Sequence, residues 1–251
     1  MNLLQAIFLG IVQGITEFLP ISSSGHLVIL QKFLALKDVE LLFDINLHLA
    51  TLLAVIIFFW KDLLKINKKM IFYLVVGTLP AVLVGLFFKD AVEKSFHNFN
   101  LAAITLMMTG VLNFITDKKL EPKNKPATRS LSTKSSFIIG IWQAIAILPG
   151  ISRSGATVFA GITQKISREE AFKFSFLLSI PAILGATVLE LSDLEFTSPI
   201  NRPIYLVGFL SSFIFGLLSL KFFSYVIKKA KLEFFAYYCF ILGGMALLLY
   251  N

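Results

Sequence analysis

The chain contains two segments, 130 positions apart, that repeat nearly the same polar break inside otherwise apolar sequence. The first covers residues 10–26 and the second residues 140–156, and the two align without a gap. Matching polar breaks in the two halves of an apolar chain are typical of membrane proteins with a site near the bilayer midplane. The identical pairs are Gly10/Gly140, Ile11/Ile141, Gln13/Gln143, Ile15/Ile145, Ile21/Ile151, Ser22/Ser152, Ser24/Ser154 and Gly25/Gly155.

The two copies differ at their ionisable positions. Where the first copy has Glu17, Ser23 and His26, the second has isoleucine, Arg153 and alanine. One copy therefore keeps the acid and the imidazole, and the other keeps the guanidinium. We interpret the pair as a duplicated scaffold whose copies contribute different groups to one active site.

The composition of the chain indicates that it folds in a lipid bilayer. Of its 251 residues, 57% are hydrophobic and only 15% are charged, which is too apolar for a soluble domain and predicts a polytopic membrane protein. The net charge of +8 is better explained by basic cytoplasmic loops than by nucleic-acid binding. The lone Cys239 excludes an intrachain disulfide, and the N-terminus lacks the basic region of a secretory signal, so we expect it to belong to the mature fold.

Hydrophobic runs predict six membrane spans and two interrupted segments. The interrupted segments, 3–34 and 136–165, are apolar at both ends but contain the Ser/Gly breaks. We interpret them as re-entrant helix–loop–helix hairpins, because unwound backbone at membrane depth must be surrounded by protein or by a water-filled cavity. The predicted spans are residues 43–60, 70–88, 99–116, 171–190, 203–221 and 234–250.

The distribution of Lys and Arg predicts the orientation. With re-entrant hairpins, the loops 61–69, 117–135, 165–173 and 221–233 share one side and carry 17 of the 23 basic residues, against five on the other side. The basic side should be cytoplasmic, which puts both termini outside. Two full crossings per hairpin would leave these loops on the same sides, so charge favours six spans without deciding re-entrance.

Three spans per half is an odd number, so the second half should be inverted relative to the first. We therefore predict an all-α membrane domain, 1–251, built as an inverted-topology repeat: half one at about 1–116, a basic cytoplasmic linker at about 117–135, and half two at about 136–251. The hairpins then enter from opposite sides, and their tips can meet near the midplane.

The first predicted tip carries an acid and a hydroxyl cluster. Gln13 and Glu17 are four residues apart and share a helix face; Glu17 either caps the broken helix or holds a divalent cation, with Gln13 as a weaker ligand. His26 can activate a hydroxyl or accept a phosphoryl group itself. Hydroxyls and free backbone N–H groups at the start of the second half-helix favour an anion. These residues are Ser22, Ser23, Ser24 and Gly25.

The second tip repeats this pattern around Arg153, whose planar guanidinium suits phosphate. A structural ion pair with Glu17 across the tips is the alternative, and the two roles are compatible. An acid for metal, a serine and a histidine, and an arginine at helix N-termini together suit phosphate or pyrophosphate ester chemistry on a substrate with an apolar tail. The accompanying anion-binding candidates are Ser152, Ser154, Gly155 and Thr157.

These motifs resemble one family, the bacterial undecaprenyl-diphosphate phosphatases or bacitracin-resistance proteins. Residues 13–26 are similar to its (E/Q)xxxE element and Ser/Gly/His loop, and residues 149–157 match its PGxSRSxxT element. The resemblance implies hydrolysis of undecaprenyl diphosphate to undecaprenyl phosphate and inorganic phosphate, with Mg²⁺ or Ca²⁺ as cofactor. It also implies recycling of the lipid carrier for the cell wall, bacitracin resistance, and a site open to the outer face of the bacterial inner (plasma) membrane.

Carried over by position, the resemblance assigns Glu17 to the metal, Arg153 to the diphosphate, and Ser23 with His26 to phosphoryl transfer. It leaves open which of the last two is the nucleophile. Many members have glutamate at the position of Gln13, which makes this glutamine the less essential ligand.

Two rival functions are a polyprenyl-phosphate transporter or flippase, because inverted repeats with broken helices are typical of transporters, and a non-catalytic bacitracin-binding or scaffold protein. Asp44 and His48, four residues apart, are candidates for a supporting role behind the site. The sequence does not decide the oligomeric state, and a homodimer stays among the partners to consider.

Overall fold

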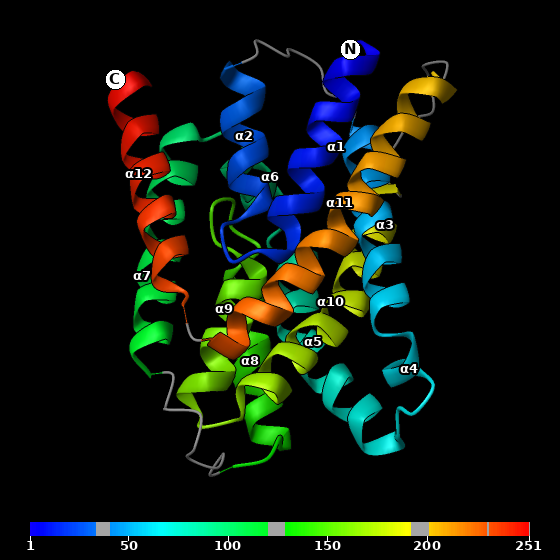
Figure 1. Ribbon diagram of the computed structural model, residues 1–251, viewed down its shortest axis with the longest axis vertical. Helices are drawn as coiled ribbons and strands as arrows, with labels where there is room; N and C mark the ends of the chain where they lie inside the picture. The colour runs from blue at the N-terminus through cyan, green and yellow to red at the C-terminus, as the bar shows by residue number, and fades with distance from the viewer. Residues whose placement is uncertain (34–40, 120–128, 192–200, 230, 251) are drawn as a thin grey trace.

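The computed structural model describes residues 1–33, 41–119, 129–191, 201–229 and 231–250, and their regular structure is α-helical, as predicted. Both chain termini lie at one end of the molecule, and α4 lies at the other (Figure 1). The helices are α1 (Leu3–Phe18), α2 (Ser23–Phe33), α3 (Leu41–Phe58), α4 (Trp60–Leu63), α5 (Lys68–Phe87), α6 (Lys89–Phe96), α7 (Phe99–Lys119), α8 (Thr133–Ile145), α9 (Arg153–Thr163), α10 (Arg168–Leu191), α11 (Arg202–Lys229) and α12 (Glu233–Tyr250).

Each of the six runs predicted to span the membrane is helical: α3, α5, α7, α10, α11 and α12. Four of them (α5, α7, α10 and α11) are long and apolar enough to cross a bilayer, whereas α3 and α12 contain shorter apolar stretches. The surface is apolar as well: only 17% of the apolar window of α5 is buried. Exposed apolar helices of this length identify a polytopic membrane protein.

The two interrupted segments form helix–loop–helix hairpins. The first is α1 and α2, broken at residues 19–22, and the second is α8 and α9, broken at residues 146–152. In Figure 1 the first hairpin extends inward from the end that carries the termini, and the second extends inward from the opposite end. The two breaks therefore meet inside the molecule.

The repeat extends to the way each hairpin begins. Asn2 caps α1 by accepting from the Gln5 N–H at 2.9 Å, and the Gln5 side chain accepts from the Asn2 N–H at 2.9 Å. At the aligned positions, Ser132 and Ser135 form the same reciprocal pair at the start of α8. Such capping boxes satisfy free backbone donors, so the two hairpins start at equivalent residues.

Each hairpin packs on a helix from the other half of the chain. Helix α1 packs along α11, and α8 packs along α5. Glycines at aligned positions allow both approaches: a Cβ at Gly10 would collide with the Gly208 carbonyl, and one at Gly140 with the Gly77 backbone. The pairs α3–α11 and α5–α10 follow the same exchange, while α7 packs on α12.

Candidate active site

The two hairpin tips are joined by a buried ion pair. The Arg153 guanidinium donates through Nη2 to Oε1 of Glu17, whose residue is only 9% exposed. Ser154 Oγ donates to the Leu19 carbonyl at 3.3 Å, and the Gly150 N–H donates to Ser24 Oγ at 3.4 Å. The cross-tip pair that the sequence left as an alternative is thus formed.

Besides its ion pair with Arg153, the Glu17 carboxylate has three contacts within the first half of the chain. Ser23 Oγ donates to Glu17 Oε2 at 2.7 Å, and Gln13 Nε2 donates to the same oxygen at 3.2 Å. His48 Nε2 lies 4.0 Å from that oxygen, while its Nδ1 bonds to the Asp44 carbonyl at 2.8 Å. His48 therefore lies beside the Glu17 carboxylate and is held there by the Asp44 backbone carbonyl.

The two serine triplets are built alike. Ser22 and Ser152 accept from the N–H groups of Gly25 and Gly155, at 3.3 and 3.1 Å, and so cap α2 and α9. The third residue of each triplet, Ser24 or Ser154, bonds through Oγ to the capping serine of its own tip and to the backbone of the other tip. Only the middle residue of each triplet, at the aligned positions 23 and 153, reaches the carboxylate of Glu17.

Ser23 and His26, which we expected to act as a pair, bond to different partners in the structure. His26 bonds through Nδ1 to the Ser22 carbonyl at 2.7 Å and through Nε2 to the Tyr238 hydroxyl at 2.7 Å, while the Ser23 hydroxyl turns to Glu17. The reason is local: His26 follows Ser22 by one helical turn, which places its ring beside that carbonyl.

The remaining candidates support the tips. Gly25 lets the tips approach, because a Cβ there would press on Gly150. Thr157 is buried and bonds to the Arg153 carbonyl at 2.8 Å and to Ser175 Oγ at 2.6 Å. It thus anchors α9 to α10 rather than facing the other tip.

Helix α7 holds both tips, which the sequence analysis missed. Thr105 donates to the Pro149 carbonyl, Thr109 to the Gly150 carbonyl at 2.8 Å, and Asn113 to the Pro20 carbonyl at 2.6 Å. The three residues are spaced four apart and therefore share one face of the helix. This polar stripe in a predicted span was the signal that could have revealed them.

The sequence comparison identifies the family. Residues 6–245 match the profile described as bacitracin resistance protein BacA. The chain belongs to the BacA family.

Relatives of this BacA-family chain match it over nearly its full length. A protein of Carboxydothermus hydrogenoformans named undecaprenyl-diphosphatase is 42% identical, with 99% of this chain and 98% of the relative aligned. An undecaprenyl-diphosphatase 4 of Bacillus thuringiensis is 40% identical over the same shares. One from Methanosphaera stadtmanae, named undecaprenyl-diphosphatase, is 37% identical, again over 99% and 98%.

Gln13 Oε1 and Arg153 Nη1, which belong to residues bonded to Glu17, are buried and have no hydrogen-bond partner among the described residues. The first is a hard oxygen acceptor beside Glu17 and the second is a cationic donor. Within the described residues, no cluster of three His, Cys, Asp or Glu could hold a metal ion. A divalent cation, if one binds here, would be held by Glu17 and the Gln13 amide oxygen, which are hard oxygen donors of the kind that Mg²⁺ and Ca²⁺ prefer.

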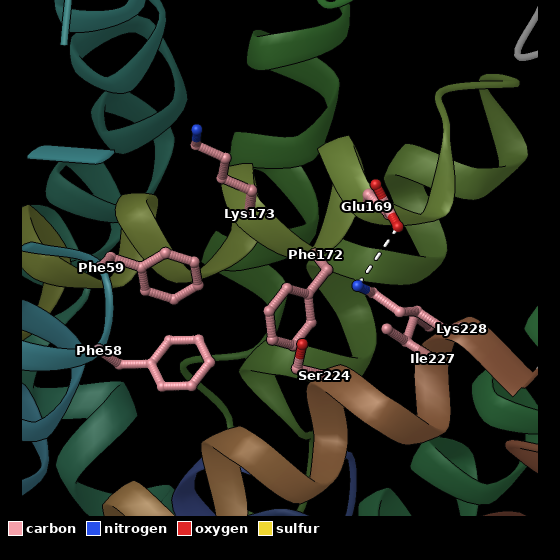
Figure 2. Close-up of a pocket in the computed structure, with 8 residues that line it drawn as sticks. All are labelled: Phe58, Phe59, Glu169, Phe172, Lys173, Ser224, Ile227 and Lys228. Atoms are coloured by element: carbon pink, nitrogen blue, oxygen red, sulfur yellow. Dashed lines mark ion pairs between the residues drawn. The ribbon is translucent and has the colours of Figure 1, made fainter. Parts of the chain in front are cut away.

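A pocket elsewhere, between α3, α10 and α11, is a poorer candidate for phosphate. Its floor is aromatic, and Figure 2 shows the ion pair of Lys228 with Glu169, at 3.4 Å, on its rim. Its other lysine, Lys173, pairs with Asp62. Both cations thus already have carboxylate partners. The lining residues are Phe58, Phe59, Glu169, Phe172, Lys173, Ser224, Ile227 and Lys228.

Proposed function

We propose that the protein hydrolyses undecaprenyl diphosphate to undecaprenyl phosphate and inorganic phosphate. One observation carries the proposal: the aligned residues Ser23 and Arg153 converge from two helix starts on the single buried carboxylate of Glu17. A hydroxyl on a carboxylate, beside a cation and two helix N-termini, suits transfer of a phosphoryl group. The relatives named undecaprenyl-diphosphatase support the same reaction. It recycles the lipid carrier for cell-wall synthesis and fits the bacitracin resistance of the family name.

The first step uses the bond between Ser23 and Glu17. The Glu17 carboxylate takes the hydroxyl proton as Ser23 Oγ bonds to the terminal phosphorus, and the bridging P–O bond breaks to release undecaprenyl phosphate. Arg153 Nη1, a cationic donor without a protein partner, binds the phosphate oxygens. A divalent cation, when bound, would neutralise further negative charge on the diphosphate.

The second step uses His26. A water gives its oxygen to phosphorus, and its proton reaches Nε2 of the imidazole through the Tyr238 hydroxyl that is bonded to that nitrogen. The bond from phosphorus to Ser23 Oγ breaks, and Glu17 returns its proton to that oxygen. Inorganic phosphate leaves, and the imidazolium loses its proton to solvent. This order makes Ser23 the nucleophile, supported by the 2.7 Å bond from its hydroxyl to Glu17.

The membrane arrangement we propose has six spans and two re-entrant hairpins, with the site open to the outer face of the plasma membrane. The shared end of both termini supports an even number of crossings. The exchanged packing of α1 on α11 and α8 on α5 supports an inverted repeat with halves 1–116 and 136–251 around the linker 117–135.

The direct test is phosphate release from a long-chain prenyl diphosphate by detergent-purified protein with Mg²⁺, Ca²⁺ or EDTA. We expect release with a metal ion, loss in EDTA, and loss in folded Glu17→Ala and Arg153→Ala variants. Exposed Lys228, at the distant pocket, provides the control Lys228→Gln. Absence of release from folded wild-type protein with either metal would overturn the phosphatase assignment.

Lipid transport is the second candidate, favoured by the exchange of hairpin partners between the two halves. Movement of a fluorescent polyprenyl phosphate between the leaflets of reconstituted vesicles tests it. Transport that persists in Glu17→Ala while hydrolysis is lost would separate the two activities.

A further inference from the structure

The last helix contributes a residue to the first tip. Tyr238 of α12 places its hydroxyl 2.7 Å from His26 Nε2, although 212 residues separate the two in sequence. The adjacent Cys239 Sγ lies 3.9 Å from the Pro20 carbonyl of the same tip. Helix α12 therefore touches the tip at two consecutive residues.

Both nitrogens of the His26 ring are engaged, and the partners define the direction of each bond. The Ser22 carbonyl can only accept, so Nδ1 carries a proton and donates to it at 2.7 Å. Neutral imidazole then accepts at Nε2, where Tyr238 donates its hydroxyl proton. Ser22 has a φ of 67°, in the left-handed region, and this backbone turn directs the carbonyl to the ring.

We propose that Tyr238 positions His26 and relays the water proton to its Nε2 in the hydrolysis reaction. The inference rests on the proposed phosphatase function and adds a residue from the opposite end of the chain. A phenol hydroxyl both donates and accepts, so it bonds to Nε2 when the imidazole is neutral and also when it is protonated. With the carbonyl on the other nitrogen, the ring keeps its orientation while the Tyr238 hydroxyl gives its proton to Nε2 and takes the water proton in exchange.

Burial supports this role over simple helix packing. His26 is 6% exposed, whereas Tyr238 is 42% exposed, so the bond joins a buried imidazole to a residue that is not part of the packed core. The rings also lie parallel, with centroids 5.6 Å apart. Tyr238→Phe keeps that ring contact and removes only the hydroxyl, which separates positioning from packing.

The experiment compares Tyr238→Phe with Tyr237→Phe. Tyr237 precedes it on the same helix and is 50% exposed, so its variant loses the same group about 100° around the helix. We expect Tyr238→Phe to lower kcat about tenfold with KM within about threefold, because one hydrogen bond to the reacting group is lost. Tyr237→Phe should stay within about twofold of wild type. Wild-type kcat in Tyr238→Phe would overturn the proposal.

A double-mutant cycle tests whether Tyr238 acts through His26. In a His26→Gln background, Tyr238→Phe should change the remaining rate by less than about twofold. A second tenfold loss there would mean that Tyr238 acts independently of His26, which contradicts the proposal.

Histidine nitrogen NMR adds a readout that does not depend on turnover. The chain has three histidines, and Tyr238→Phe should move the Nε2 signal of His26 while leaving those of His48 and His97 in place. An unchanged His26 signal would overturn the positioning role. If Tyr238→Phe moves the His26 signal but the wild-type protein releases no phosphate, the proposed function is overturned and the contact between the two residues is not.

Discussion

Glu17 is a single carboxylate that serves both copies of a duplicated motif. The first copy supplies Ser23 and the second supplies Arg153, from aligned positions, and each bonds to a different oxygen of the same group. The difference between the aligned residues Ser23 and Arg153 therefore gives Glu17 a different partner from each tip. The reaction we propose needs both halves, since neither contains the acid, the hydroxyl and the guanidinium together.

Replacing Glu17 with glutamine tests this at the level of one atom pair. The amide keeps the shape but has no negative charge for Arg153 and cannot take the Ser23 proton, so we expect hydrolysis to fall about 100-fold or more. Loss of one partner of a buried ion pair also destabilises by about 3–5 kcal/mol, which thermal unfolding in detergent would detect. Glu169→Gln, at an exposed ion pair, is the control. Activity equal to that of this control would contradict the role of Glu17.

Ser23→Ala tests the nucleophile. We expect phosphate release to be lost and no labelled phosphoserine to be trapped by acid quenching and peptide mass spectrometry, because the attacking oxygen is gone. Ser95→Ala, in α6, removes a hydroxyl that bonds only within its own helix among the contacts described and should behave as wild type. Trapping of phosphohistidine at His26 in the wild-type enzyme would contradict the assignment to Ser23.

At this scale the sequence predicted which residues meet but not every bond between them. The pairing of Glu17 with Arg153, which the sequence offered as an alternative to phosphate binding, is formed. The bonds of Ser23 and His26 depend on the left-handed turn at Ser22 and on a tyrosine 212 residues away. Neither the turn nor the distant partner is visible in a local motif.

Among the elements, α7 fixes the position of both hairpin tips. Its stripe of Thr105, Thr109 and Asn113 binds carbonyl oxygens of both loops, which satisfies backbone groups that lipid could not. A hydroxyl inside a helix commonly bonds to its own backbone, so the sequence alone did not single out these residues. Their role becomes visible only in the structure, where the two interrupted hairpins place free carbonyl oxygens beside this face of α7.

Gly140→Ala tests the close packing of α8 on α5. The new Cβ would collide with the Gly77 backbone, and overpacking of this kind costs about 1–3 kcal/mol. We expect a lower thermal unfolding midpoint in detergent. Gly185→Ala, inside α10 with no atom within 4 Å of the added Cβ, is the matched control and should not lower the midpoint. An equal midpoint in the two variants would contradict the proposed contact.

For the whole molecule, the sidedness of the loops is the testable quantity. In a Cys239→Ala background, a single cysteine at Lys94 should react with a membrane-impermeant maleimide applied outside. One at Lys134 should react only after permeabilisation, because the basic loops are cytoplasmic. Labelling of both from outside would contradict the proposed orientation.

The sequence predicted the broad architecture at this scale and missed the pairing of its parts. Hydropathy placed six runs, all of which are helices, and located both hairpins; α3 and α12 are shorter apolar stretches than a simple span requires. The exchange of α1 and α8 between halves was not predicted, since glycines such as Gly10 and Gly140 indicate a close neighbour without saying which one it is.

That exchange has a consequence for biosynthesis. Helix α1 leaves the ribosome first, yet its packing partner α11 begins at Arg202. The first hairpin therefore has no packing partner during translation until most of the chain has been made. The second hairpin meets α5, which is already inserted, and can dock at once. If the two halves are made as separate polypeptides, we expect quality-control proteases to degrade the N-terminal half when it is made alone. Production of the C-terminal half in the same cells should protect it.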